Sequence, residues 1–261
     1  MIHHEAWYRE ALTEVEVRRL KRDLDDGQIT PEEYSRQVGR SGQPTLFDFG
    51  EGPVPAHRHI NPDESMGGWV AETATVAVSA TVGKDAWVYG NAKVEDEAKI
   101  GDQAQVYGNA RVYGEAGIYG SAQVSGDARV YSRAEVYGNA EVSGDALVYG
   151  DAWVYDWAHV WGAARVFGTA QVYGGALVFG RAHVSGDAKV YGEALVYGEA
   201  WVYDWAHVWG TARVLGNAQV HGAARIHDKA RVYGDARVYG DARVYDKARV
   251  YYTISSGEAT E

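Results

Sequence analysis

Histidine is the residue type in this sequence best suited to acid–base or metal chemistry, because the chain has 9 His and no Cys. A neutral imidazole can take up a proton or bind a metal, whereas thiol nucleophiles, disulfides and cysteine-ligated metal sites are excluded. His159 and His207 occupy equivalent places in two nearly identical segments, Asp151–Gly162 and Glu199–Gly210. We take these two as the candidates for a catalytic base. The alternative is that they are solvated surface residues of regular strands.

A metal site needs more ligands than the sequence brings together. His207 and His227 are the closest pair that the repeat places on one face, and a zinc ion would still need at least a third ligand. A second histidine group lies nearer the N-terminus and consists of His3, His4, His57 and His59. We expect neither group to hold a metal, and we expect no cofactor.

The elements that position these side chains form a repeat, which runs from Thr73 to Tyr252 as thirty consecutive six-residue units without insertion. The second residue of each unit is Ala, the fourth is Val or Ile, and the sixth is mostly Gly or Asp. This alternation has the period of a β-strand with Ala and Val facing inward. Gly and Asp tolerate the left-handed backbone angles of a turn. A helix is excluded, because apolar residues do not recur at three and four positions.

Units such as Asn109-Ala-Arg-Val-Tyr-Gly114 resemble the hexapeptide repeat of left-handed β-helix proteins, over residues 67–252. The resemblance implies a mainly β fold, a triangular prism of about ten coils with three units in each coil. The lead-in Gly67-Gly68-Trp69-Val70 is most similar to uncharacterised bacterial and phage members. Acyltransferase members use a catalytic His and often place Gly directly after the aliphatic residue, where this chain usually has Tyr.

Three units per coil place every third unit on the same face, which predicts outward ladders of aromatic residues at the fifth position. The longest predicted ladder contains Tyr119, Tyr137, Tyr155, Tyr173, Tyr191, Trp209, His227 and Tyr245. A second ladder is interrupted at Ser185, and the third is interrupted at Ser125 and Ser143. The rings either stabilise neighbouring strands by stacking or form a contact surface for a protomer, a protein partner or a sugar.

The residues outside the repeat predict a helical cap, a linker and a tail. Gly27 ends the first predicted helix, and the segment around it resembles the short helical hairpins called SHOCT domains, which are associated with oligomerisation. Leu46, Phe47 and Phe49 are expected to dock on the prism. The expected divisions are residues 1–40 for the hairpin, 41–66 for a Pro-rich linker or cap, 67–252 for the β-helix, and 253–261 for a tail that caps the last coil poorly.

The net charge of −11 and the polar N-terminus predict a soluble, cytoplasmic protein that binds no membrane. The charge also disfavours nucleic acid, although the last coils are locally basic, with Asp residues as the expected partners of their Arg and Lys. We expect a non-enzymatic structural or interaction rod, phage-associated, that forms a homo-oligomer or binds an unknown protein through an end or an aromatic face. The alternatives are an acyltransferase-like enzyme working at a trimer interface with a His base, and a carbohydrate-binding surface.

Overall fold

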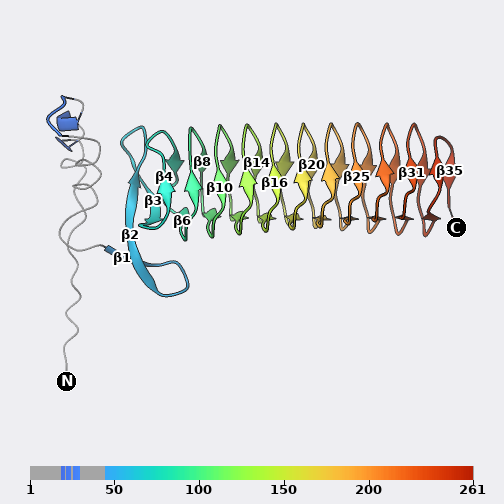
Figure 1. Ribbon diagram of the computed structural model, residues 1–261, viewed down its shortest axis with the longest axis horizontal. Helices are drawn as coiled ribbons and strands as arrows, with labels where there is room; N and C mark the ends of the chain where they lie inside the picture. The colour runs from blue at the N-terminus through green and yellow to red at the C-terminus, as the bar shows by residue number, and fades with distance from the viewer. Residues whose placement is uncertain (1–18, 21, 25, 30–44, 261) are drawn as a thin grey trace, which may run out of the picture.

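The computed structural model describes residues 19–20, 22–24, 26–29 and 45–260. Residues 45–260 form a rod of short strands stacked along its long axis (Figure 1). Three sheets make the sides of the rod. Each contains eleven parallel strands, because every third strand along the chain joins the same sheet. The predicted β-helix is confirmed, with about eleven coils rather than ten.

The three sheets are named A, B and C in the order in which the chain first enters them. Sheet A comprises β1 (Thr45–Asp48), β2 (Pro53–Ile60), β3 (Met66–Ala71), β6 (Trp87–Val88), β9 (Gln105–Val106), β12 (Gln123–Val124), β15 (Glu141–Val142), β18 (His159–Val160), β21 (Leu177–Val178), β24 (Leu195–Val196), β27 (Arg213–Val214), β30 (Arg231–Val232) and β33 (Arg249–Val250). Sheet B comprises β4 (Thr75–Val76), β7 (Lys93–Val94), β10 (Arg111–Val112), β13 (Arg129–Val130), β16 (Leu147–Val148), β19 (Arg165–Val166), β22 (His183–Val184), β25 (Trp201–Val202), β28 (Gln219–Val220), β31 (Arg237–Val238) and β34 (Thr253–Ile254). Sheet C comprises β5 (Thr81–Val82), β8 (Lys99–Ile100), β11 (Gly117–Ile118), β14 (Glu135–Val136), β17 (Trp153–Val154), β20 (Gln171–Val172), β23 (Lys189–Val190), β26 (His207–Val208), β29 (Arg225–Ile226), β32 (Arg243–Val244) and β35 (Glu258–Ala259).

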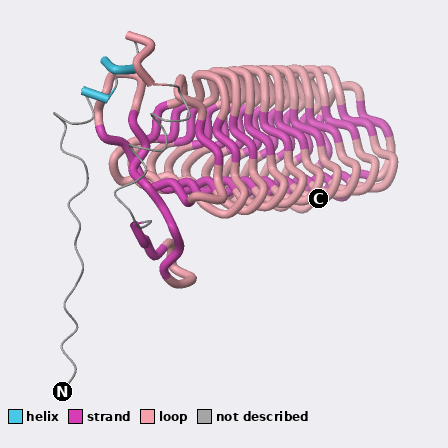
Figure 2. The backbone as a smooth tube through the Cα atoms, turned by 60° about the vertical axis from the view of Figure 1, so that its left-hand side comes forward, coloured by secondary structure: helices cyan, strands magenta, loops and turns pink. Residues whose placement is uncertain are grey.

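The register between strands repeats without a slip along the rod. Arg111 pairs with Arg129 and Val112 pairs with Val130, a separation of three six-residue units. Figure 2 shows the result, with the strands of successive coils aligned in rows and joined by protruding loops. Every residue therefore lies above the residue at the same position in the preceding coil, which makes a continuous ladder of any side chain repeated at that spacing.

The core is a column of small and branched side chains. Ala110 and Val112, the second and fourth residues of one unit, are both fully buried, and the same positions are buried from Ala80 to Val250. The alternation predicts this arrangement because successive strand residues point to opposite faces. Ala suits the tight corner and Val fills the space between the sheets.

The corners of the prism depend on the sixth residue of each unit. Gly114 has a φ of 73° and Asp96, one coil earlier, has a φ of 57°. Glycine adopts this left-handed region freely, whereas Asp tolerates it with some strain. The Oδ2 atom of Asp96 accepts a hydrogen bond of 2.9 Å from the Gly114 N–H, and this bond offsets part of the strain.

The N-terminal end of sheet A is covered by an antiparallel hairpin. Strand β1 pairs with β2, and β2 pairs with β3, the first strand of the solenoid. Phe47 and Phe49 pack between the hairpin and the first coils, as predicted, whereas Leu46 is 59% exposed. The described part of the segment expected as a linker is therefore a β-structured cap.

The structure also describes parts of the predicted C-terminal tail and of the predicted N-terminal hairpin. Strands β34 and β35 lie in the segment expected to be a tail, and together with β3 they account for the eleventh coil. The predicted helical hairpin lies mostly outside the described residues. Within them, Arg22–Leu24 is helical and the chain turns at Gly27, which has a φ of 68° and donates its N–H to Leu24 O at 3.0 Å.

Candidate binding surfaces

The longest aromatic row lies on sheet C, and we call it the sheet C ladder. Its members are Tyr137, Tyr155, Tyr173, Tyr191, Trp209, His227 and Tyr245. The Tyr155 and Tyr173 rings are nearly parallel, with centroids 4.8 Å apart. The predicted ladder is confirmed over these residues, since the parallel register places successive fifth residues directly above one another.

Tyr119, predicted at the start of this ladder, does not join it. Its ring lies against the backbone of Gly117 and Gly101, where an added Cβ would collide with the ring atoms. The third position of its own unit and the fifth position of the preceding coil both lack a side chain, and the ring fills that space. The two glycines are the signal in the sequence that marks this departure.

Stacking determines what the sheet C ladder presents to solvent. Each inner ring has both faces covered by its neighbours, so ring edges and hydroxyl groups face outward. Burial raises the pKa of Tyr173 above its usual value, and the adjacent Tyr155 and Tyr191 raise it further. The hydroxyl groups are therefore neutral hydrogen-bonding groups near pH 7. A sugar needs an open ring face to stack on, and the rings in the middle of this ladder have none.

Sheets A and B carry shorter ladders, broken at the predicted serines. On sheet B, four stacked rings run from Tyr113 to Phe167. The following gap at Ser185 is closed by His183 and Trp201, whose rings contact at 4.2 Å, and Ser185 is only 8% exposed. On sheet A, Tyr89 and Tyr107 stack before the gap at Ser125 and Ser143.

The most exposed tryptophans belong to the duplicated segment. Trp157 is 64% exposed and Trp205 is 65% exposed. They precede strands β18 and β26, which lie on sheets A and C respectively, so the two copies face different sides of the rod as predicted. With three sides to the prism, the second copy of the segment lies one face away from the first. A four-sided prism would place both copies on the same face, so it is excluded.

The two candidate catalytic histidines are not brought together, because His159 lies on sheet A and His207 lies on sheet C. His159 Nδ1 is 3.7 Å from the Glu141 carboxylate. Burial lowers the pKa of His207, and Lys189 and Arg225 lower it further. A neutral His207 can accept a proton, but it packs edge-on against the ladder rings Tyr191 and Trp209.

The other histidines have separate partners. His227 is stacked on Trp209 and its Nδ1 lies 3.0 Å from Asp228, so it does not face His207. Near the cap, His57 contacts Glu72 at 2.9 Å, while the buried His59 contacts Ala80 O at 3.0 Å. His3 and His4 lie outside the described residues. Within residues 45–260 and the short described N-terminal segments, no three His, Asp or Glu side chains are grouped as a metal site.

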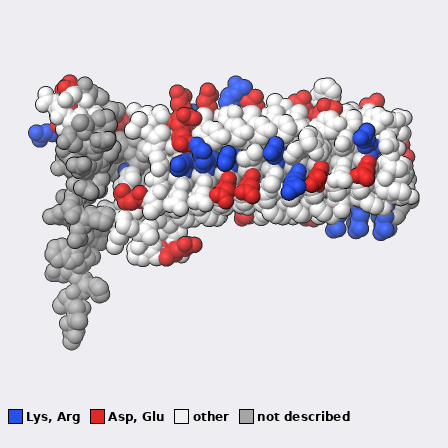
Figure 3. All heavy atoms as spheres, in the orientation of Figure 1, with Lys and Arg blue, Asp and Glu red and all other residues white. Residues whose placement is uncertain are grey.

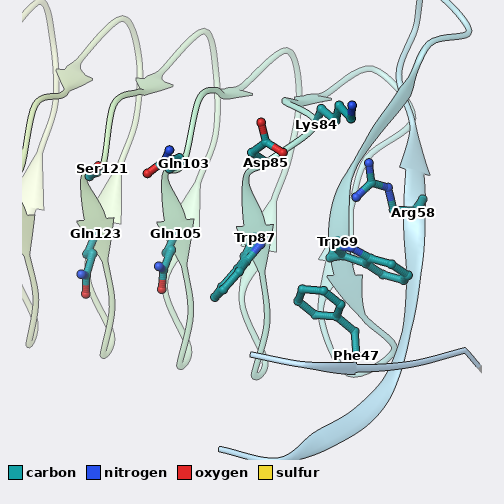
Figure 4. Close-up of a pocket in the computed structure, with 10 residues that line it drawn as sticks. All are labelled: Phe47, Arg58, Trp69, Lys84, Asp85, Trp87, Gln103, Gln105, Ser121 and Gln123. Atoms are coloured by element: carbon teal, nitrogen blue, oxygen red, sulfur yellow. The ribbon is translucent and has the colours of Figure 1, made fainter. Parts of the chain in front are cut away.

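Sequence reasoning missed a groove of about 560 Å³ at the N-terminal end of sheet A. Figure 4 shows Phe47 from the cap beside Trp69 and Trp87 at one end, and Gln105 and Gln123 along the following coils. Phe47 stacks on Trp69 at 4.5 Å and the Arg58 guanidinium lies 5.2 Å from the same indole. The hairpin that forms one wall lies outside the repeat, so the period of the sequence could not reveal it.

The C-terminal coils carry a row of cations on sheet A. Arg213, Arg231 and Arg249 are in register on three successive coils. The expected Asp partners lie elsewhere, since Asp228 contacts His227 and Asp235 accepts a hydrogen bond from Asn217. Figure 3 shows a short row of Lys and Arg side chains along one edge close to this end of the rod.

Comparison with known proteins supports the architecture. A family model described as the YdcK Beta solenoid repeat matches residues 104–120, 140–156, 230–246 and 236–252. The chain is a β-solenoid repeat protein. No curated protein matched the chain significantly. None of the helical residues described belongs to a helix long and apolar enough to cross a membrane.

Proposed function

We propose that this β-solenoid is a structural rod whose C-terminal coil pairs with the same coil of a second copy. The observation that carries the proposal is the unpaired edge of the last coil that the structure describes. Strands β33, β34 and β35 each have a neighbour on one side only within the described residues. An unpaired strand edge presents free N–H and C=O groups that invite pairing with another chain.

The direction of the hydrogen bonds shows which groups are offered. Arg231 N–H donates to Ala248 O at 2.8 Å and Tyr233 N–H donates to Val250 O at 2.9 Å, both in the next coil. The equivalent N–H groups of the last coil, including that of Thr253, therefore point away from the rod. Exposed aromatic surface lies beside them, because Tyr251 is 65% exposed and Tyr252 is 52% exposed. Polar edge groups and adjacent apolar surface together favour association.

The two ends differ, and the difference favours a closed dimer. At the N-terminal end, β2 covers the edge of β3 in sheet A, and the Oδ1 atom of Asn61 accepts a hydrogen bond from Val82 N–H of β5 in sheet C, whereas the outer edge of β4 in sheet B has no paired strand among the described residues. Head-to-tail stacking on all three sheets would need the covered edge of β3 and would build an open filament, whereas pairing of two C-terminal coils uses the same surface twice and closes. The expected mass is twice that of the 28.5 kDa chain.

Light scattering coupled to size exclusion tests the proposal. We expect a dimer for the native chain and a monomer for Thr253→Pro, because proline removes an outward N–H that makes no bond within the rod. The matched control Thr253→Ala keeps this N–H and should remain dimeric. A monomeric native chain contradicts the proposal, and a dimeric Thr253→Pro variant shows that another surface pairs. A trimer would favour the acyltransferase-like alternative instead.

Carbohydrate binding is a second candidate, favoured by the exposure of Trp157 and Trp205. Indole faces open to solvent can stack on sugar rings, whereas the inner rings of the sheet C ladder cover each other. In a glycan-binding screen, Trp157→Ala and Trp205→Ala should reduce any signal, and Tyr155→Ala, within the ladder, should not. Loss of signal with Tyr155→Ala alone would point to the ladder edge.

A further inference from the structure

We propose that sheet A holds a nucleoside polyphosphate near its C-terminal end, with the base stacked between Tyr197 and Tyr233 and the phosphates on a row of arginines. A hollow of about 200 Å³ lies at this place, and we call it the Leu215 slot. Its lining consists of Tyr197, Arg213, Leu215, Arg231, Tyr233 and Arg249. The proposed function uses the main-chain edge of β33, the strand that carries Arg249, but not the side chains that line this slot.

The slot exists because one rung of an aromatic row lacks a ring. Tyr197 stacks on Phe179 at 4.8 Å with an angle of 1° between the rings, so one of its faces is covered and the other faces Leu215. Tyr233 lies two coils beyond Tyr197 in the same row. With strands about 4.8 Å apart, the two tyrosines are separated by roughly 9.6 Å along the rod. One further planar ring fits between them at the spacing that the ladders already use.

The corresponding gap on sheet B shows that the Leu215 slot is distinctive. At Ser185, the neighbouring third-position residues His183 and Trp201 fold over the gap and bury the serine. At Leu215, the third-position residues are Arg213 and Arg231, which line the hollow without filling it. The slot therefore keeps an apolar floor, aromatic ends and a cationic side.

The arginine row lacks compensating charge. Arg213, Arg231 and Arg249 stand directly above one another, and like charges in such register are destabilising. Lys229 and Lys247, the first residues of the β30 and β33 units, add to the same side of the rod. None of these five side chains makes an ion pair or hydrogen bond in the part of the chain that the structure describes.

Some other arginines of the rod are paired. Among the described residues Arg129, Arg165, Arg225 and Arg237 also form no ion pair, but none of these four lies next to another in register, so a row of three free arginines is a local property. Arg111 contacts Glu95 at 2.7 Å, and Arg133 contacts Asp151 at 2.8 Å. In a chain of net charge −11, a run of five unpaired cations marks a site for an anion of several charges. Arginine also matches phosphate geometry through its planar fork of donors.

The two halves of the site together select the occupant. The slot takes a planar ring of limited width, and the row takes an extended, multiply charged group beside it. A nucleoside polyphosphate supplies both in one molecule. A nucleic acid strand would need successive stacking platforms for its bases. Here a single slot is open, while the neighbouring Phe179 and Tyr197 are stacked on each other.

Equilibrium dialysis of the full chain against ATP at low ionic strength tests the proposal. ATP should bind more tightly than adenosine or inorganic tripolyphosphate, and its affinity should fall as salt is added. Leu215→Tyr completes the aromatic row and fills the slot, and Arg231→Gln removes the central cation. Each should weaken ATP binding on the order of tenfold, which is within the range measured for a stacked base or a charged contact.

Two matched variants on sheet B serve as controls, namely Leu147→Tyr and Arg237→Gln, which occupy exposed or half-exposed third positions. Both should bind ATP as the native chain does, and circular dichroism establishes that all four variants are folded. Absence of ATP binding overturns the proposal. Equal affinities for ATP and tripolyphosphate with no effect of Leu215→Tyr also overturn it, because the base would then not enter the slot. Tighter binding of single-stranded RNA that is insensitive to Leu215→Tyr would assign the cations to a different ligand.

Discussion

Stacking within the sheet C ladder should be measurable as an energetic coupling between two tyrosines. Tyr155 and Tyr173 stack at 4.8 Å with an angle of 5° between their rings. An aromatic pair of this kind contributes about 0.5–1.5 kcal/mol beyond the area it buries. We therefore expect a double-mutant cycle of Tyr155→Ala and Tyr173→Ala to give a coupling free energy in that range. Tyr173→Ala alone removes two stacked contacts, since Tyr191 lies on its other face.

The chain contains its own control for this cycle. Tyr119 and Tyr137 have the same spacing in sequence and the same register, but the Tyr119 ring lies over Gly117 and Gly101. The cycle of Tyr119→Ala and Tyr137→Ala should give a coupling close to zero, within the roughly 0.3–0.5 kcal/mol typical of independent sites.

Guanidinium unfolding followed by far-UV circular dichroism is the assay for both cycles. The slope of the free energy with denaturant must be unchanged among the variants, because a repeat array can lose cooperativity. Equal coupling free energies in the two cycles would refute the reasoning, since the stacked pair would then be no more strongly coupled than the unstacked pair in the same register. A coupling near zero for Tyr155 and Tyr173 would also refute it and would leave the ladder as a consequence of register alone.

Three further predictions concern the corners, the cap and the start of the ladder. Asp204→Ala should lower the free energy of unfolding by about 1–2 kcal/mol, because Ala keeps the strained φ of 59° and loses the hydrogen bond from Gly222 N–H. Asp204→Gly should cost less, and denaturant unfolding measures both variants. The pKa of His59 is lowered from 6.5, mainly by burial, so as the pH falls His59 is protonated at a higher pH in the unfolded chain than in the folded chain. Stability from this residue is therefore complete above pH 6.5 and falls as the pH drops through that value, and His59→Gln should flatten the pH profile of the melting temperature. Gly117→Ala should push the Tyr119 ring off the backbone and onto Tyr137, which would create the coupling that the native pair lacks.

The repeat carries enough information to predict the sheets, the register and the core. Ala110 and Val112 alternate with outward residues and recur at every unit, so a single strand prediction propagates along the rod. The ladder positions follow from the same arithmetic, and so does the placement of the two tryptophan-rich segments on different faces. Each of these properties depends on local alternation, which the sequence displays directly.

Features that depend on non-repeating neighbours were not predictable in the same way. The pairing of β2 with β3 involves a segment with no period, so the cap and its groove emerge only in three dimensions. Strands β34 and β35 continue two sheets without the six-residue pattern. Tyr119 leaves its ladder because of two glycines in different coils. The Leu215 slot is visible in the sequence as a missing ring, but its openness depends on arginines rather than larger rings beside it.

The unbroken register of the coils has a consequence for how the rod would respond to force. Hydrogen bonds between coils run along the long axis, so tension on the two ends acts across every coil boundary in series, and the coils would separate one after another. Each coil contains 18 residues, as the spacing of paired positions such as Asn109 and Asp127 shows. Releasing one coil would free roughly 60 Å of extended chain, against about 4.8 Å of rod. The rod would thus lengthen by nearly the same amount each time a coil unfolds, and optical-tweezers traces should show extension steps of one nearly constant size.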